Sequence, residues 1–171
     1  MTGILKVDSI QNSGGTAAMT IDSGGRILTP ARPSWRLGLS GNQSITTGAV
    51  NTVNFTDSTG TLKHLDGGCT LSGGKITVPV AGVYHASATL RMDSLTASDY
   101  AEMHIRHETT GGTITEIGYV ISGTPSTTYE NATASVTVKM AANEKLFVAT
   151  YTADNSWTIS SLSSFSGFLV G

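Results

Sequence analysis

The feature that most constrains the fold is a period-two spacing of apolar residues in several short runs. Residues 82–92, GVYHASATLRM, place on one face Tyr84, Ala86, Ala88, Leu90 and Met92. The other face receives Val83, His85, Ser87, Thr89 and Arg91. Such alternation is typical of a β-strand with one buried face, because successive side chains point to opposite sides. No segment shows a convincing 3.6-residue apolar period, so the sequence predicts an all-β chain.

Other short runs, bounded by Gly, Asn, Asp or Ser, predict further strands. They cover residues 75–80, 114–121, 133–140, 145–152 and 164–170, with weaker candidates at residues 35–39, 50–55 and 100–107. About eight or nine short strands without intervening helices predict an antiparallel β-sandwich or jelly roll. The same pattern excludes a parallel α/β sheet.

The first 32 residues are organised differently. They contain two short apolar stretches, residues 4–10 and 19–28, each interrupted or followed by Gly-Gly. The fragments at residues 7–9 (VDS) and 21–23 (IDS) indicate a weak internal repeat, from which we expect two β-arcs in series. An isolated hairpin is marginal in water, so such an arm needs a partner surface.

A proline-bracketed stretch, TPARP at residues 29–33, follows the arm. Proline favours extended, stiff backbone on both sides of itself. The sequence therefore predicts an arm at residues 1–32 and a separate head domain at residues 33–171.

Charge and cysteine content exclude several classes. Only 13% of residues are charged, where about a quarter is usual, and the net charge is -2 without any run of like charges. We therefore expect no nucleic-acid partner. Cys69 is the only cysteine, which excludes an internal disulfide and a paired-cysteine metal motif. No apolar run reaches the length of a signal peptide or a membrane span, so we expect synthesis in a cytoplasm and no membrane partner.

Three stretches of the head domain match a known pattern in order and spacing. Residues 75–84, KITVPVAGVY, combine a strand that ends in Pro with a Gly-x-Tyr that opens the next strand. Residues 135–148, SVTVKMAANEKLFV, contain a strand, a charged turn and a second strand, and residues 164–170 read SFSGFLV. Residues 33–171 thereby resemble the complement-1q/tumour-necrosis-factor jelly-roll family. The resemblance covers the whole head and is specific for fold rather than for function.

The resemblance implies a homotrimer, because members of this family associate around a three-fold axis. Aromatic residues expected to contribute to the trimer interface are Tyr84, Tyr151, Phe165 and Phe168. The alternative, that these side chains fill the core of each protomer, stays open at this point.

The arm carries a second resemblance. Residues 4–12 (ILKVDSIQN) and 20–27 (TIDSGGRI) resemble the anchor segments that open tail-fibre and decoration proteins of marine and cyanobacterial phages. Animal relatives of the head carry a collagen-like stalk here, and this chain has no Gly-x-y period. The resemblance implies that residues 1–32 dock on a major capsid or tail protein. The residues expected to anchor the arm to the virion are Ile4, Val7, Ile10, Ile21 and Ile27.

Enzyme motifs are weak. Residues 22–25, DSGG, resemble the sequence around the nucleophile of trypsin-like proteases, but the base precedes that serine and here no histidine occurs before His64. A turn in the arm is the better interpretation. The sequence contains no Gly-x-Ser-x-Gly elbow, phosphate-binding loop or His-Glu-x-x-His motif. We therefore expect no enzymatic activity and no cofactor.

Histidines and acidic residues give no metal motif. His104 and His107 lie on one predicted strand at an odd offset, which places them on opposite faces, and we expect surface or rim histidines. Glu102, His104 and Arg106 share a face and predict a solvated or intersubunit row of ion pairs. Asp57, Asp93 and Asp99 sit in predicted loops without the spacing of a calcium loop. Cys69 is interpreted as a half-buried packing residue.

Together these patterns predict a non-enzymatic structural protein of a bacteriophage, made in the host cytoplasm and displayed on the virion surface. A capsid decoration (cement) protein is favoured over a fibre, because the chain lacks a long shaft. The alternatives are a receptor-binding tip of a tail fibre and a bacterial carbohydrate-binding adhesin module, and a host-surface glycan is a further candidate partner. A polysaccharide depolymerase needs paired carboxylates on a groove, and the acidic residues here lie on separate predicted loops.

Overall fold

The computed structural model describes residues 6–56, 63–94, 100–123, 129–153 and 156–171. These residues form antiparallel strands, and no helix occurs among them, which confirms the predicted all-β class. The chain separates into two compact units, residues 1–32 and residues 33–171. The division falls at the proline-bracketed stretch, and each unit is described by itself.

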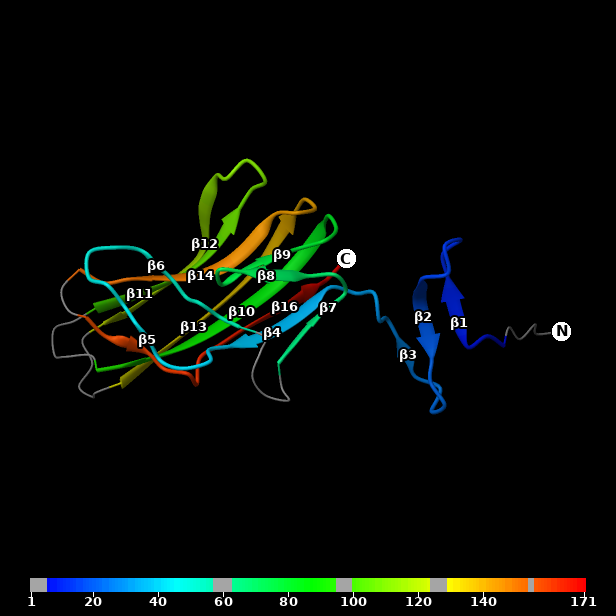
Figure 1. Cartoon of the computed structure of the whole chain (residues 1–171), viewed down its shortest axis with the longest axis horizontal. Helices are drawn as coiled ribbons and strands as arrows, with labels where there is room; N and C mark the ends of the chain where they lie inside the picture. Colours follow the sequence, from blue (N-terminus) through cyan, green and yellow to red (C-terminus); the bar gives the residue numbers. More distant parts are fainter. Residues whose placement is uncertain (1–5, 57–62, 95–99, 124–128, 154–155) are drawn as a thin grey trace. The chain divides into compact units, whose positions relative to one another are not determined.

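The first unit is a three-stranded antiparallel sheet of consecutive hairpins (Figure 1). Its strands are β1 (Ser9–Gln11), β2 (Ala17–Ile21) and β3 (Ile27–Leu28). Two β-arcs were expected here, and the expectation was wrong because both connecting turns fold the chain back onto itself. In each turn the side chain of Asn12 or Asp22 accepts hydrogen bonds from the backbone N–H groups two and four residues later. Gly15 and Gly25 supply the positive φ that such a turn requires.

The first sheet of the second unit is built around one long central strand. It contains β4 (Ser34–Gly38), β5 (Gln43–Ser44), β7 (His64–Asp66), β10 (Gly82–Asp93), β13 (Tyr129–Met140), β15 (Thr158–Ile159) and β16 (Ser164–Leu169). The order is β5–β15–β10–β16–β4–β7, and β13 pairs with the full length of β10. Since β15 and β16 share one edge of β10, β13 lies along the other edge.

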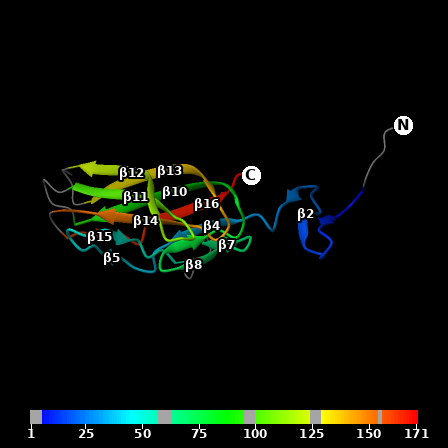
Figure 2. The same cartoon turned by 90° about the horizontal axis from the view of Figure 1, so that it is seen from above.

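The second sheet has β14 at its centre. It contains β6 (Asn51–Thr52), β8 (Thr70–Ser72), β9 (Lys75–Thr77), β11 (Tyr100–Glu108), β12 (Ile114–Gly123) and β14 (Lys145–Tyr151). The order is β12–β11–β14–β9–β8, and β6 pairs with β14. The long strands of both sheets run lengthwise through the unit in both views (Figures 1 and 2).

Both sheets contribute to a single buried apolar cluster. Trp35 of β4 lies 5.8 Å from the ring of Phe165 and 6.4 Å from the ring of Tyr84, measured between centroids. Ile105 of β11 and Val148 of β14 reach the same cluster from the second sheet. Every second residue of β10 is buried, from Tyr84 onward, which confirms the two faces predicted for this strand.

Two aromatic residues expected at a trimer interface are core residues instead. Tyr84 and Phe165 each expose 0% of their surface. The Tyr84 hydroxyl donates a hydrogen bond to the carbonyl of Val80, 2.9 Å away. Because neither side chain reaches the protomer surface, the structure corrects their assignment to an interface and favours the alternative of core packing.

Candidate functional site

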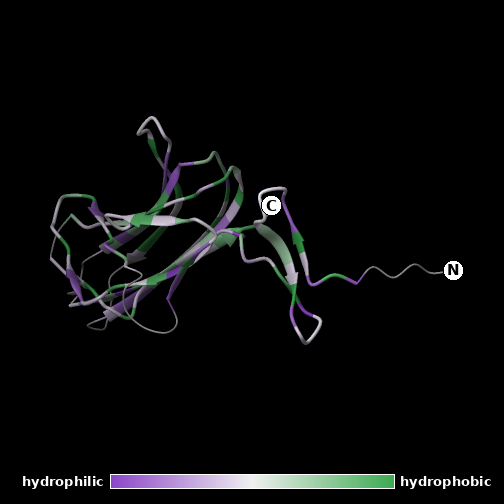
Figure 3. Ribbon diagram, turned by 45° about the vertical axis from the view of Figure 1, so that its right-hand side comes forward, coloured by the Kyte–Doolittle hydropathy of each residue, from purple (hydrophilic) through white to green (hydrophobic). Residues whose placement is uncertain are grey.

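The first candidate site is an uncovered apolar face of the N-terminal sheet. Ile10 pairs with Met19, and Ile21 pairs with Ile27. Paired residues of antiparallel strands share a face, and so do residues two apart along a strand. These four residues therefore lie on one face, which we call the arm face. Ile10, Ile21 and Ile27 are 49%, 37% and 62% exposed. Figure 3 shows apolar strand segments alternating with polar turns in this unit.

Of the other residues predicted to anchor the arm, Val7 is half-buried and precedes β1, and Ile4 lies outside the described residues. Leu28 pairs with Thr20 on the opposite face of the sheet and is 48% exposed. Sequence reasoning missed Met19 as a member of the arm face, although its spacing of two from Ile21 carried the signal.

The Asp-Ser-Gly-Gly segment of the arm is committed to a turn. Asp22 accepts hydrogen bonds from the backbone N–H groups of Arg26 and Gly24 and pairs with the Arg26 guanidinium at 2.7 Å. The backbone and side-chain hydrogen bonds from Arg26 lower the pKa of Asp22. The carboxylate is therefore used to hold the turn, as the turn interpretation of this segment requires.

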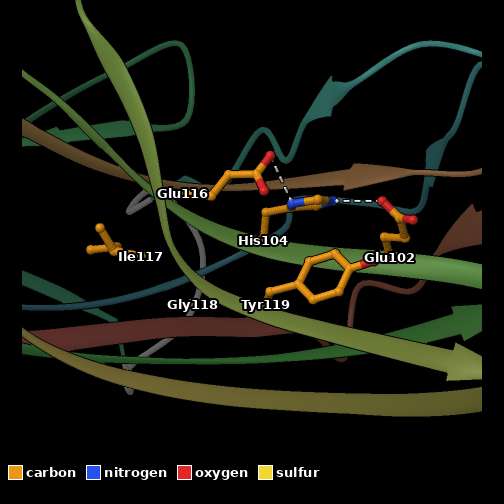
Figure 4. Close-up of a pocket in the computed structure, with 6 residues that line it drawn as sticks. All are labelled: Glu102, His104, Glu116, Ile117, Gly118 and Tyr119. Atoms are coloured by element: carbon orange, nitrogen blue, oxygen red, sulfur yellow. Dashed lines mark hydrogen bonds and ion pairs between the residues drawn. The ribbon is translucent and has the colours of Figure 1, made fainter.

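The second candidate site is a surface hollow on the outer face of the second sheet, which we call the β11–β12 hollow (Figure 4). Its lining side chains include Glu102 and His104 of β11 and Glu116 and Tyr119 of β12. His104 lies directly opposite Tyr119, and Arg106 lies directly opposite Glu116. The sheet register thus gathers charged and aromatic side chains at one place.

His104 occupies the centre of the hollow between two carboxylates. Its Nε2 lies 3.1 Å from Oε2 of Glu102, and its Nδ1 lies 3.1 Å from Oε1 of Glu116. Nδ1 has almost no exposed surface, and its polar partner is Glu116. His104 is 4% exposed, which shows that the expectation of a surface histidine was wrong here. The Tyr119 ring covers the imidazole at 5.0 Å in an edge-on arrangement.

The charges around the hollow are coupled. Burial alone would raise the pKa of Glu116, but the hydrogen bond from Arg106 and the nearby His104 outweigh burial and lower that pKa. Burial, a hydrogen bond with Glu102 and the neighbouring negative charges raise the pKa of Tyr119. At neutral pH the hollow therefore presents an ionised Glu116 beside a neutral phenol.

The predicted row of charged residues on β11 is present, since Glu102, His104 and Arg106 alternate with core residues. The row continues to Glu108, whose carboxylate bridges Lys75 at 2.5 Å and Lys145 at 2.6 Å. Hydrogen bonds from these two lysines, Lys145 first, lower the pKa of Glu108. The second half of the row is thus a satisfied ion-pair cluster.

Several other titratable residues pair with neighbours outside the β11–β12 hollow. His107 pairs with Glu144 at 2.8 Å, away from His104, and Asp93 pairs with Arg91 at 2.8 Å. Burial raises the pKa of Cys69 to about 11, and this residue is 6% exposed, so it is buried rather than half-buried. Asp57 and Asp99 lie outside the described residues. Among the residues that the structure describes, no three His, Cys, Asp or Glu side chains form a metal-binding group.

The two other residues expected at a trimer interface are not brought together. Phe168 is 44% exposed and lies 5.6 Å from the ring of His85 on the first sheet. Tyr151 ends β14 opposite Glu102 on the second sheet and is half-buried. An interface that used both residues would therefore involve two different surfaces of the protomer.

Comparisons of the sequence with protein-family models and with curated proteins give no match. No helix long and apolar enough to span a membrane occurs in the described ranges of the chain.

Proposed function

We propose that the protein is a non-enzymatic structural protein of a bacteriophage virion. In this proposal it is a homotrimeric capsid decoration or fibre protein, made in the host cytoplasm. The arm, residues 1–32, docks on a major capsid or tail protein. The head, residues 33–171, is a jelly roll displayed at the virion surface.

The chain path through the two sheets supports the jelly-roll assignment. The chain changes sheet between β9 and β10, between β10 and β11, between β12 and β13, and at both ends of β14. A jelly roll is a double sheet of antiparallel strands in which the chain crosses repeatedly between layers. The hairpin of β11 and β12 is the one place where two consecutive long strands stay in the same sheet.

The observation that carries the docking proposal is the arm face. A small sheet of short strands has little buried surface of its own, and covering its apolar face stabilises it. Covering Ile10, Met19, Ile21 and Ile27 would contribute about 1–2 kcal/mol for each side chain, since each is at present only partly buried. Three arms on one particle would bind far more tightly than a single arm.

Exposed apolar residues of the head support self-association. Ile121 of β12 is 55% exposed, Phe168 of β16 is 44% exposed and Leu162 is 71% exposed. Closed rings of identical subunits remove such surface from water without leaving an open end. The mass of the full chain in solution tests this part, and we expect three times the 17.7 kDa of one chain.

The docking proposal is tested with a matched pair of arm variants. Ile27→Asp places a charge on the arm face, and Leu28→Asp places the same charge on the opposite face of the neighbouring position. Purified variants are added to virions that lack the protein, and bound protein is measured by co-sedimentation. We expect Ile27→Asp to abolish binding and Leu28→Asp to retain it. Equal binding by the two variants would refute docking through the arm face.

Deleting the protein distinguishes cementing from receptor binding. A decoration protein predicts virions that lose integrity under osmotic shock, and a receptor-binding tip predicts intact virions that adsorb poorly. The two outcomes are read from the same preparation of virions.

A further inference from the structure

We propose that the β11–β12 hollow binds a neutral pyranose sugar. This proposal concerns the head alone and does not depend on attachment to a virion. The argument uses the four side chains that Figure 4 shows around the hollow: Glu102, His104, Glu116 and Tyr119.

The aromatic ring supplies the first element of recognition. Tyr119 is 48% exposed although its ring contacts His104, so part of the ring surface faces solvent. Aromatic faces carry negative charge density and attract the C–H groups that line one side of a pyranose ring. Tyr119 sits within the paired part of β12, so its backbone is already ordered before any ligand binds.

The polar groups supply the second element. Carboxylates accept hydrogen bonds only, and hydrogen bonds from hydroxyls to charged oxygens are stronger than neutral ones. Both contacts to Glu116 from His104 and Arg106 fall on Oε1, which leaves Oε2 without a partner among the described residues. Glu102 stands on the other side of the imidazole. Hydroxyl groups of a ring that packs against Tyr119 would donate to the free oxygen of Glu116, which lines the same hollow.

The buried imidazole holds the two carboxylates in place. The His104 side chain is only 5% exposed, and its two ring nitrogens lie 3.1 Å from Glu102 and 3.1 Å from Glu116. The acceptors of the hollow are therefore positioned before any ligand binds.

The charge of the hollow selects among ligands. Two carboxylates flank the site, so an anionic sugar would be repelled. A metal ion is disfavoured because the positive Arg106 guanidinium lies beside Glu116, and no metal-binding group exists in the described part of the chain. The hollow is open rather than enclosed, which suits weak binding at each site and multivalent attachment to a polysaccharide.

The test uses the full-length protein and saturation-transfer NMR. The probes are the methyl glycosides of glucose, galactose and mannose, with methyl glucuronide as the anionic comparison. We expect saturation transfer to at least one neutral glycoside and none to the glucuronide. Absence of transfer to all three neutral glycosides would overturn the proposal, as would equal transfer to the glucuronide.

Variants locate the binding. Tyr119→Ala should abolish the transfer, and Tyr129→Ala, at a tyrosine of equal exposure (49%) on β13, should preserve it. Unchanged transfer in Tyr119→Ala would place binding elsewhere and refute the site. A lower melting temperature of Tyr119→Ala would mean that the variant is destabilised. In that case Glu116→Gln tests the site, and we expect it to reduce saturation transfer at least several-fold. The measurement contains no virion, so loss of sugar binding and loss of docking are separate results.

Discussion

Gly167 lies in a tightly packed part of the head, and its replacement by alanine gives a sharp test of the packing. A Cβ atom at this position would lie 2.3 Å from Cζ2 of Trp35, 2.6 Å from Cη2 of Trp35 and 2.7 Å from the carbonyl oxygen of His85. None of these atoms is the end of a flexible side chain, and Trp35 is 1% exposed. Added volume in a packed core costs about 1–3 kcal/mol, and rigid neighbours on two sides favour the upper end.

We therefore expect Gly167→Ala to lower the free energy of unfolding by about 3 kcal/mol, which corresponds to about 10 °C in melting temperature for a chain of this size. The assay is a urea titration at fixed protein concentration, because self-association would make the apparent stability concentration-dependent. Gly41→Ala is the matched control, since a Cβ there meets nothing within 4 Å. The control should stay within about 0.5 kcal/mol of the unmodified protein.

Repeating Gly167→Ala in a Trp35→Phe variant separates the contact with Trp35 from the contact with the His85 carbonyl. Trp35→Phe removes the two indole carbon atoms that the added methyl group would meet, whereas the His85 carbonyl remains. The cost of Gly167→Ala should therefore fall by about 1 kcal/mol or more in the Trp35→Phe background. A cost below about 0.5 kcal/mol in the original background, or the same cost in both backgrounds, would show that the packing argument is wrong.

Three further predictions concern single side chains. The pKa of Glu108 is lowered in the folded state, so its stabilising contribution is fully present above the usual value of 4.5 and is lost as the pH falls through the lower folded-state pKa. Glu108→Gln should thus flatten the acid side of the stability curve, as measured by urea titrations at neutral and acid pH. Cys69, with its pKa raised to about 11, should resist a chromogenic thiol reagent at neutral pH and react once denaturant unfolds the head. Tyr84→Phe removes a 2.9 Å hydrogen bond to a backbone carbonyl and should cost about 1 kcal/mol in the same titration, and no loss would mean that the bond is replaced.

Much of the head was predictable from sequence through strand parity, which is the alternation of successive side chains between the two faces of a strand. The two faces of β10 follow from alternation alone, and so does the shared face of Glu102, His104 and Arg106. Parity is a local property of the backbone and needs no knowledge of the partner strand. The short strands β7 and β8 were missed because three residues are too few to show a period, and they form only by pairing with β4 and β9.

Parity also limits what sequence can say about aromatic residues. Phe165 and Phe168 are three positions apart, so they must point to opposite sides of β16. Which of them is buried depends on the neighbours, and Trp35 fills the inner side next to Phe165. From sequence alone, both phenylalanines were candidates for an interface. The tertiary structure shows that Phe165 packs in the core and that Phe168 is exposed.

In the β11–β12 hollow, too, some features follow from the sequence and others only from the tertiary structure. The shared face of Glu102, His104 and Arg106 was readable from the sequence, whereas the partner strand was not. In the structure Arg106 meets Glu116 because each lies two positions beyond the Glu108–Ile114 pair next to the turn. The register then shifts by one residue beside Ile105, and this shift brings Tyr119 rather than Gly118 opposite His104. A bulge arises from how two strands accommodate each other, so the burial of His104 under an aromatic ring was decided by the tertiary structure and not by the pattern along either strand.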